Sequence, residues 1–150
     1  MRVMLDTNVL ISYAIFGSGT IARVVEDVAL NHELILSTYV IDEFREVVAR
    51  RWPARSVAVE RFLARAPFET VVTPKLIEDG LFEIRDELDY PVLYSAVVGF
   101  ADVLVAGGKD FADVDVERPD IVTPAQYLER YASLPRAIRR IGCIELPRSW

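Results

Sequence analysis

The chain has 150 residues, the usual size of one domain, and its 52% hydrophobic against 27% charged residues predicts a globular protein with a sizeable core. A net charge of −6 argues against a surface coated in basic residues for non-specific nucleic-acid binding, although acidic groups around bound cations would account for part of it. One cysteine, Cys143, and one histidine, His32, exclude an internal disulfide and disfavour a zinc site, so acidic side chains must carry any chemistry.

The first part of the chain alternates predicted strands and helices. A short apolar run predicts a buried strand that ends at Asp6, and Gly17 to Thr20 break the helix that follows it. Ser37 or Thr38 has the side chain of a helix N-cap. The elements predicted here are a strand at 3–5, a helix through 9–11, a helix at 21–31, a strand at 34–36 and a helix reaching about Arg51.

The second part continues this alternation, and only Leu81 to Ile84 could be either extended or helical. The elements predicted here are a helix at 56–66, a strand at 68–72, a helix at 91–100, strands at 103–105 and 121–122, and a helix at 124–131. This order predicts an α/β protein of three layers, in which helices flank both faces of a mostly parallel sheet. Residues 133–150 are predicted to be a basic C-terminal extension of a domain formed by residues 1–132.

Two acids stand out by their predicted positions. Parallel sheets bind ligands at the carboxyl ends of their strands, and Asp6 lies at such an end. Glu43 stands beside Val40 and Val47 at the margin of the apolar face of its predicted helix. A carboxylate there costs free energy unless it is paired, protonated or bound to a metal. Alternatively, Glu43 reaches solvent or pairs with an arginine.

Further acids cluster later in the chain. Asp86, Glu87 and Asp89 precede a predicted helix, whose N-terminus favours negative charge, but capping accounts for only one of them. Asp110 follows the turn formed by Gly107 and Gly108. Together with the two earlier acids, these groups could converge at one edge of the sheet. Mg²⁺ or Mn²⁺ takes oxygen ligands and often leaves room for water and a substrate phosphate, which points to metal-assisted hydrolysis of a phosphodiester.

Two groups of arginines could contact phosphates, although a run of charges is usually a solvated helix face. They are Arg45, Arg50, Arg51, Arg55, Arg61 and Arg65 in the middle of the chain, and Arg136, Arg139, Arg140 and Arg148 at its end.

Four sequence blocks in order resemble the PIN domain family, especially the small VapC-like bacterial toxins of toxin–antitoxin pairs. The resemblance covers most of residues 1 to 132. The blocks are Met4 to Ser12 with the order MLDTNVLIS, Ser37 to Phe44, Asp89 to Leu93 with the order DYPVL, and Ala101 to Phe111 followed by Ile121 to Leu128.

The resemblance implies a PIN fold and a metal-dependent endoribonuclease that uses Mg²⁺ or Mn²⁺, with RNA as substrate. By position, Asp6, Glu43 and Asp89 match the core metal-binding and catalytic acids of the family. Asn8 would orient the first acid or the attacking water, unless it is only a polar residue at the helix start. The resemblance also implies a cognate antitoxin protein and a homodimer.

This sequence departs from the family pattern at one place. Where related proteins commonly have Thr-Gly-Asp-Lys-Asp, residues 106–110 have Ala-Gly-Gly-Lys-Asp, so Gly108 replaces the fourth acid. Asp110 could bind the metal instead, or it could simply cap the turn. The alternative function is therefore a catalytically degenerate PIN domain that acts as an RNA- or protein-binding module.

Two other expectations follow from the sequence. An aspartyl phosphatase would need a second acid two residues after Asp6, and that position is Asn8. No run of about 18 uncharged apolar residues and no signal-peptide pattern is present, so we expect a cytoplasmic protein without a membrane partner. For the dimer, the helix at Val24 to Leu30 or the aromatic side chains of Tyr90, Tyr94 and Phe100 could form the interface, unless they are ordinary core.

Overall fold

The computed structural model describes residues 1–17, 19–84, 87–107, 111 and 114–132. The positions of Gly108 and Asp110 and the extension at 133–150 lie outside these described residues. A five-stranded sheet has the strand order β3-β2-β1-β4-β5, and every pairing in it is parallel. The strands are β1 (Arg2–Leu5), β2 (Glu33–Ser37), β3 (Phe68–Val71), β4 (Val103–Val105) and β5 (Asp120–Val122).

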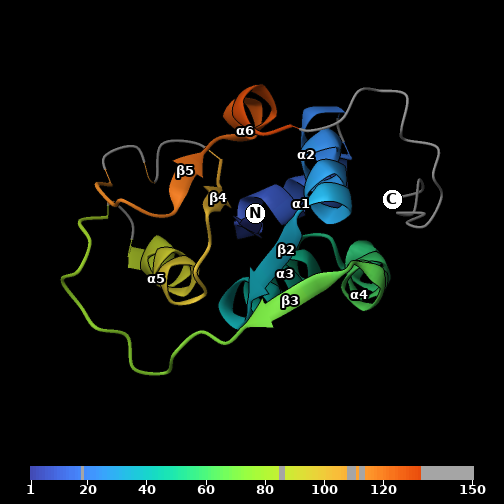
Figure 1. Ribbon diagram of the computed structural model, residues 1–150. Coiled ribbons are helices and arrows are strands. Elements are labelled where there is room, and N and C mark those ends of the chain that lie inside the picture. Colours follow the sequence, from blue (N-terminus) through green and yellow to red (C-terminus); the bar gives the residue numbers. More distant parts are fainter. Residues whose placement is uncertain (18, 85–86, 108–110, 112–113, 133–150) are drawn as a thin grey trace.

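Helices flank both faces of this sheet, which confirms the predicted three-layer α/β fold. α5 covers one face, and α2 and α6 lie together on the other (Figure 1). The helices are α1 (Thr7–Phe16), α2 (Gly19–Asn31), α3 (Thr38–Arg51), α4 (Ser56–Arg65), α5 (Tyr90–Val98) and α6 (Pro124–Arg130), with 3₁₀ turns η1 (Pro53–Arg55) and η2 (Glu87–Asp89).

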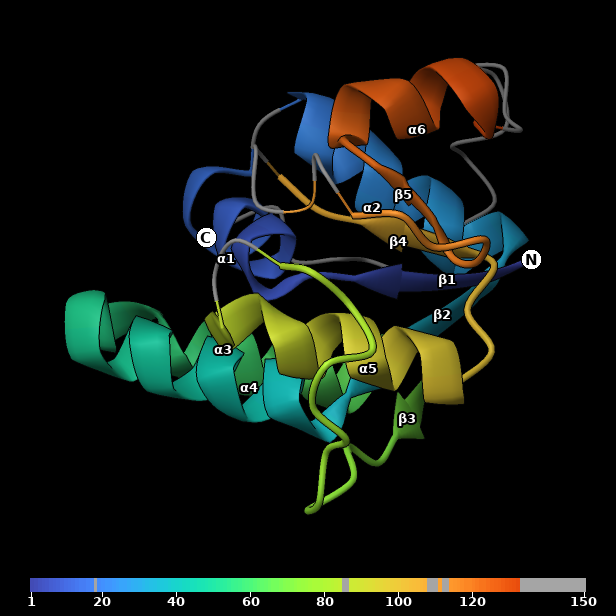
Figure 2. The ribbon, with the colours of Figure 1, turned by 90° about the vertical axis from the view of Figure 1, so that its left-hand side faces the viewer.

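The central strands are apolar because both of their faces are covered. Val3 of β1 pairs with Leu34 of β2 on one side and with Val103 of β4 on the other, and all three side chains are buried. The segment at 81–84, which the sequence left open, forms neither helix nor strand. It belongs to the connection from β3 to α5 that crosses the outer side of α5 (Figure 2).

Three aromatic side chains join α1, α3 and α4. Phe62 of α4 packs against Tyr13 of α1 at a ring-centroid distance of 5.7 Å and against Phe44 of α3 at 6.2 Å. All three side chains are buried, and burial raises the pKa of the Tyr13 hydroxyl. This cluster fixes α1 and α3 relative to each other.

A buried polar contact joins α2 to α6. The Tyr127 hydroxyl donates to Asp27 at 2.6 Å, and Asn31 donates to the other carboxylate oxygen at 2.9 Å. Burial, followed by the contact with Asp27, raises the pKa of Tyr127. Val24, Val25 and Val28 of α2 are also buried, so this part of the proposed dimer helix is ordinary core.

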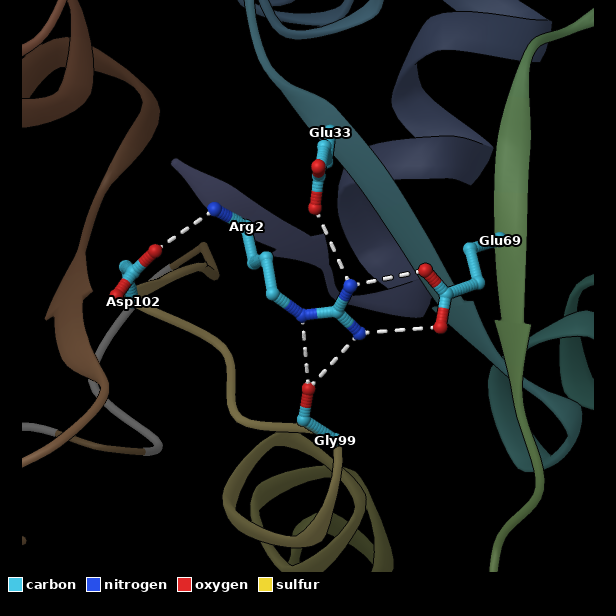
Figure 3. Close-up of polar contacts among 5 residues, drawn as sticks. All are labelled: Arg2, Glu33, Glu69, Gly99 and Asp102. Carbon is cyan, nitrogen blue, oxygen red and sulfur yellow. Dashed lines mark hydrogen bonds and ion pairs between the residues drawn. The ribbon is translucent and has the colours of Figure 1, made fainter.

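Arg2 ties together the amino ends of the strands (Figure 3). Its guanidinium donates two hydrogen bonds to Glu69 of β3, one to Glu33 of β2 at 3.2 Å, and two to the carbonyl oxygen of Gly99, at the C-terminus of α5. Its backbone N–H donates to Asp102, just before β4, at 2.8 Å. One side chain thus fixes the amino edge of the sheet and the C-terminus of α5.

This contact predicts a pH-dependent contribution to stability. Hydrogen bonds from Arg2, and secondly its charge, hold the pKa of the Glu69 carboxyl below its ordinary value. A lowered pKa in the folded state stabilises the protein above the ordinary glutamate pKa, and this stabilisation is lost as the pH falls through the lowered value. We therefore expect Arg2→Met to lower the melting temperature at pH 7, and the difference from wild type to shrink toward about pH 3.

Thermal unfolding of both proteins across this pH range checks the expectation. Part of the difference should persist in acid, because the bond to the Gly99 carbonyl does not titrate. Arg23→Met removes an exposed arginine from α2 and is the matched control. A difference between wild type and Arg2→Met that stays constant down to low pH would contradict the role of the Glu69 carboxylate.

Among the described helices, none is by itself long and apolar enough to cross a membrane. α1 and α2 reach that length and apolarity only as a pair, and the pair is bent by 117°.

Candidate active site

Asp6 lies at the carboxyl edge of the sheet, between β1 and α1. In Figure 2 the N-terminus is at the right and α1 at the left, so this edge faces left. The backbone N–H of Asp6 donates to the Val105 carbonyl at the end of β4 (2.9 Å), and its carboxylate accepts from the Thr7 N–H at 2.8 Å. The residue is only 2% exposed. Asp6 therefore caps α1 and carries a carboxylate that is almost completely withdrawn from solvent.

Glu43 lies on α3, which begins directly at the carboxyl end of β2. Val40 and Phe44 are buried, Asp42 is exposed, and Glu43 is half-buried between them. This is the margin position that the helical spacing predicts. Ser37, the last residue of β2, caps α3 by accepting from the Val40 N–H, which brings the first turns of the helix close to the sheet edge.

Asp89 lies at the N-terminus of α5. The chain continues from α5 into β4, which runs parallel to β1, and the C-terminus of α5 contacts Arg2 at the amino edge. The N-terminus of α5 therefore lies toward the carboxyl edge. Asp89 makes no capping hydrogen bond to α5, so its half-buried carboxylate is not explained by helix capping.

One hydrogen bond brings Asp89 toward Glu43. The Tyr39 hydroxyl in the first turn of α3 donates to the carbonyl oxygen of Leu88 at 3.2 Å. Tyr39 and Glu43 are four residues apart, so they share a face of α3. The face of α3 that carries Glu43 is thus the face that meets the segment ending in Asp89.

Thr73 and Ser95 connect the same two helices, and the sequence reasoning missed both. Thr73 follows β3; its Oγ1 accepts from the Tyr39 N–H at 3.2 Å, and its own N–H donates to Thr38 Oγ1 at 3.0 Å. Ser95 Oγ of α5 is fully buried and lies 3.0 Å from Thr73 Oγ1. These contacts set the position of the N-terminus of α3 against α5.

Comparison with known proteins now identifies the family. A sequence profile of the PIN domain family, described as "PIN domain", matches residues 2–110, which is more than half of the chain. The chain belongs to the PIN domain family. A comparison with curated protein sequences finds no match.

The fold of this PIN domain also has a counterpart among solved structures. The crystal structure of VapBC2 from Rickettsia felis, bound to a DNA fragment from their promoter, contains a chain that is similar to it with a TM-score of 0.61 and 18% sequence identity. The match covers 81% of this chain and 97% of that chain. It confirms the PIN-like fold.

The donors of this PIN domain suit a hard divalent cation. Asp6, Glu43 and Asp89 offer carboxylate oxygens, which Mg²⁺ and Mn²⁺ prefer. Thr7 Oγ1, next to Asp6, is buried and has no hydrogen-bond partner among the described residues, so a polar oxygen stands available beside the carboxylate. Within the described ranges no three His, Cys, Asp or Glu side chains form a group that could hold a metal ion. One or two carboxylates with water and a substrate phosphate would be the coordination that these residues fit.

The remaining predicted residues are placed only in part. Asn8 lies in the first turn of α1 and is exposed, so its amide is open to solvent next to Asp6. Gly108 and Asp110 come shortly after β4 in the sequence, and both lie outside the described residues. Whether Asp110 replaces the missing acid stays a prediction.

Proposed function

We propose that this PIN domain is a metal-dependent endoribonuclease that acts in the cytoplasm as the toxin of a toxin–antitoxin pair. The observation that carries the proposal is the buried carboxylate of Asp6 at the end of β1, on the edge from which α3 and α5 present Glu43 and Asp89. Acids on three separate elements near one sheet edge fit the ligand-binding position of parallel α/β folds.

The residues divide the work as follows. Mg²⁺ or Mn²⁺ would be held by one or two carboxylates drawn from Asp6, Glu43 and Asp89, with Asp110 as a further candidate, and by water and the substrate phosphate. The bound ion lowers the pKa of a water molecule and neutralises charge on the scissile phosphate. The hydrogen bond from the Thr7 N–H fixes the Asp6 carboxylate, so this side chain would bind the ion without changing its conformation. The exposed amide of Asn8 would orient the attacking water, so no histidine base is needed.

The partners belong to the same proposal. The solved relative is a VapBC2 structure, which supports a cognate antitoxin as the protein that binds and blocks this PIN domain. A homodimer is proposed as well. Phe100 remains exposed, whereas Tyr90 stacks on Tyr94 and its hydroxyl donates to the Glu78 carbonyl at 2.6 Å. Of the suggested aromatic surface, Phe100 is therefore the part open to a second copy.

Gly108 favours a second candidate function. If the loss of the fourth acid abolishes binding of the ion, the same fold would act as an RNA- or protein-binding module without cleavage. Gly108→Asp restores the fourth acid and distinguishes the two functions. It should create RNA cleavage where the wild-type protein has none only if the wild-type site is degenerate.

Cleavage of purified total RNA in Mn²⁺ or Mg²⁺ tests the proposal. We expect discrete products that EDTA abolishes. Glu43→Gln should slow cleavage by about a hundredfold or more, since a lost metal ligand removes several kcal/mol of transition-state stabilisation. Asp42→Asn removes the neighbouring, exposed carboxylate of α3 and should leave the rate unchanged. Equal rates for wild type and Glu43→Gln, or cleavage that persists in EDTA, would refute the proposal.

A further inference from the structure

A groove lined by apolar and charged side chains lies between α5 and two loops. It has a volume of about 490 Å³, and its lining includes Leu81, Phe82, Val97 and Val116. Leu81 is 52% exposed and Val97 is 38% exposed, so large apolar side chains face solvent here. Asp115, Glu117 and Arg118 line the same groove and are exposed, and the Arg118 guanidinium is engaged with Asp102 at 3.2 Å. We call this feature the α5 groove.

The charge of the chain is divided unevenly around this groove. Residues 133–150 contain four arginines and one glutamate, a net charge of +3. Because the whole chain has a net charge of −6, residues 1–132 have a net charge of −9. A basic segment next to an acidic body is attracted to it at physiological ionic strength within a Debye length of about 8 Å.

The described chain ends close to the groove. Tyr131, just after α6, donates its hydroxyl hydrogen to Asp120 at the start of β5, which raises the pKa of Tyr131. Asp120 is three residues from Glu117, a chain distance of at most about 10 Å. The eighteen residues that follow Ala132 can span up to about 60 Å. They are long enough to pass the edge strand β5 and reach the α5 groove.

The sequence of this extension matches the groove in chemistry. Leu134, Ile138 and Ile141 recur at intervals of four and three residues, with Arg136, Arg139 and Arg140 between them. Apolar side chains at this spacing can share one side of a segment and leave the arginines at its flanks. A second copy of the chain fits less well, because a symmetric pairing would bring the acidic rims of two net negative bodies together.

We propose that the C-terminal extension, residues 133–150, docks in the α5 groove of its own chain. The isoleucines cover Leu81 and Val97, and the arginines pair with Asp115 and Glu117. This surface is separate from the carboxyl edge that carries Asp6, so the docking does not depend on the proposed nuclease activity.

The single native cysteine allows a direct test on the full chain. Cys143 lies in the extension, so a nitroxide label there can be paired with one at Val98→Cys, an exposed position of α5 beside the groove. The control pair uses Arg23→Cys on α2, on the opposite face of the sheet. Electron–electron double resonance should give a narrow distance distribution for both pairs, with the shorter distance to Val98→Cys.

Charge reversal sharpens the test. Asp115→Lys with Glu117→Lys should broaden both distributions, and adding Arg139→Glu with Arg140→Glu should narrow them again. Broad distributions in the unaltered background, or a shorter distance to Arg23→Cys, would overturn the proposal. Loss of the short distance on dilution with unlabelled protein would show that a second copy, and not the same chain, fills the groove.

Discussion

Asp6→Asn should strongly slow RNA cleavage while leaving the protein folded. The asparagine side-chain oxygen can still accept from the Thr7 N–H, so the cap of α1 is kept, but the negative charge that would hold the ion is lost. We expect the cleavage rate to fall by about a hundredfold or more. Titration calorimetry with Mn²⁺ should show weaker binding of the ion in the same variant.

A separate measurement distinguishes loss of function from loss of fold. The unfolding free energy of Asp6→Asn should match that of wild type or exceed it, because a buried charge has been replaced by a neutral group. Asp6→Ala, which also removes the cap, should be less stable than Asp6→Asn by about 1 kcal/mol. Full activity of Asp6→Asn would remove Asp6 from the metal site.

Phe62→Ala should produce the largest loss of stability. The side chain is 1% exposed and joins α4 to Tyr13 and Phe44, so its truncation leaves a cavity between three helices. Such a change costs about 3–5 kcal/mol of unfolding free energy. Denaturant unfolding followed by circular dichroism measures the loss.

The same helix supplies the control for this prediction. Val57 of α4 is 65% exposed, and Val57→Ala should change the unfolding free energy by less than about 0.5 kcal/mol. A loss of only about 1 kcal/mol in Phe62→Ala would show that α4 is peripheral to the fold. It would then be unable to hold α3, and with it Glu43, in place.

Most of the fold could be predicted because local patterns decide it. The apolar runs of β1, β2 and β4 reflect burial on both faces, and the N-cap residue Ser37 marks the start of α3. The segment at 81–84 could not be predicted, because its position depends on contacts with α5. There the Leu81 N–H donates to the Tyr90 hydroxyl, a contact that has no local sequence signal.

The candidate site shows the same division. Glu43 could be placed at the helix margin because helical periodicity fixes its angle relative to Val40 and Phe44. Thr73 and Ser95 could not be recognised, since Thr73 is an ordinary residue until the fold brings it against Thr38 and Tyr39, and Ser95 until it meets Thr73. Ser95 lies close to the third acidic block in the sequence, but Thr73 does not, and hydroxyl residues are common everywhere. Long-range hydrogen bonds of this kind are visible only in three dimensions.

The network around Arg2 also guides how the protein should be handled in the laboratory. The Met1 carbonyl accepts from the Glu33 N–H at 2.9 Å, so the start of the chain is held at the sheet edge opposite Asp6. An affinity tag placed before Met1 would leave from that far edge and keep clear of the carboxylates. A tag joined after Trp150 would instead be attached directly to the basic extension and could disturb its contacts. Reporter fusions at the N-terminus are therefore the suitable format for assaying both the carboxyl edge and the extension in one protein.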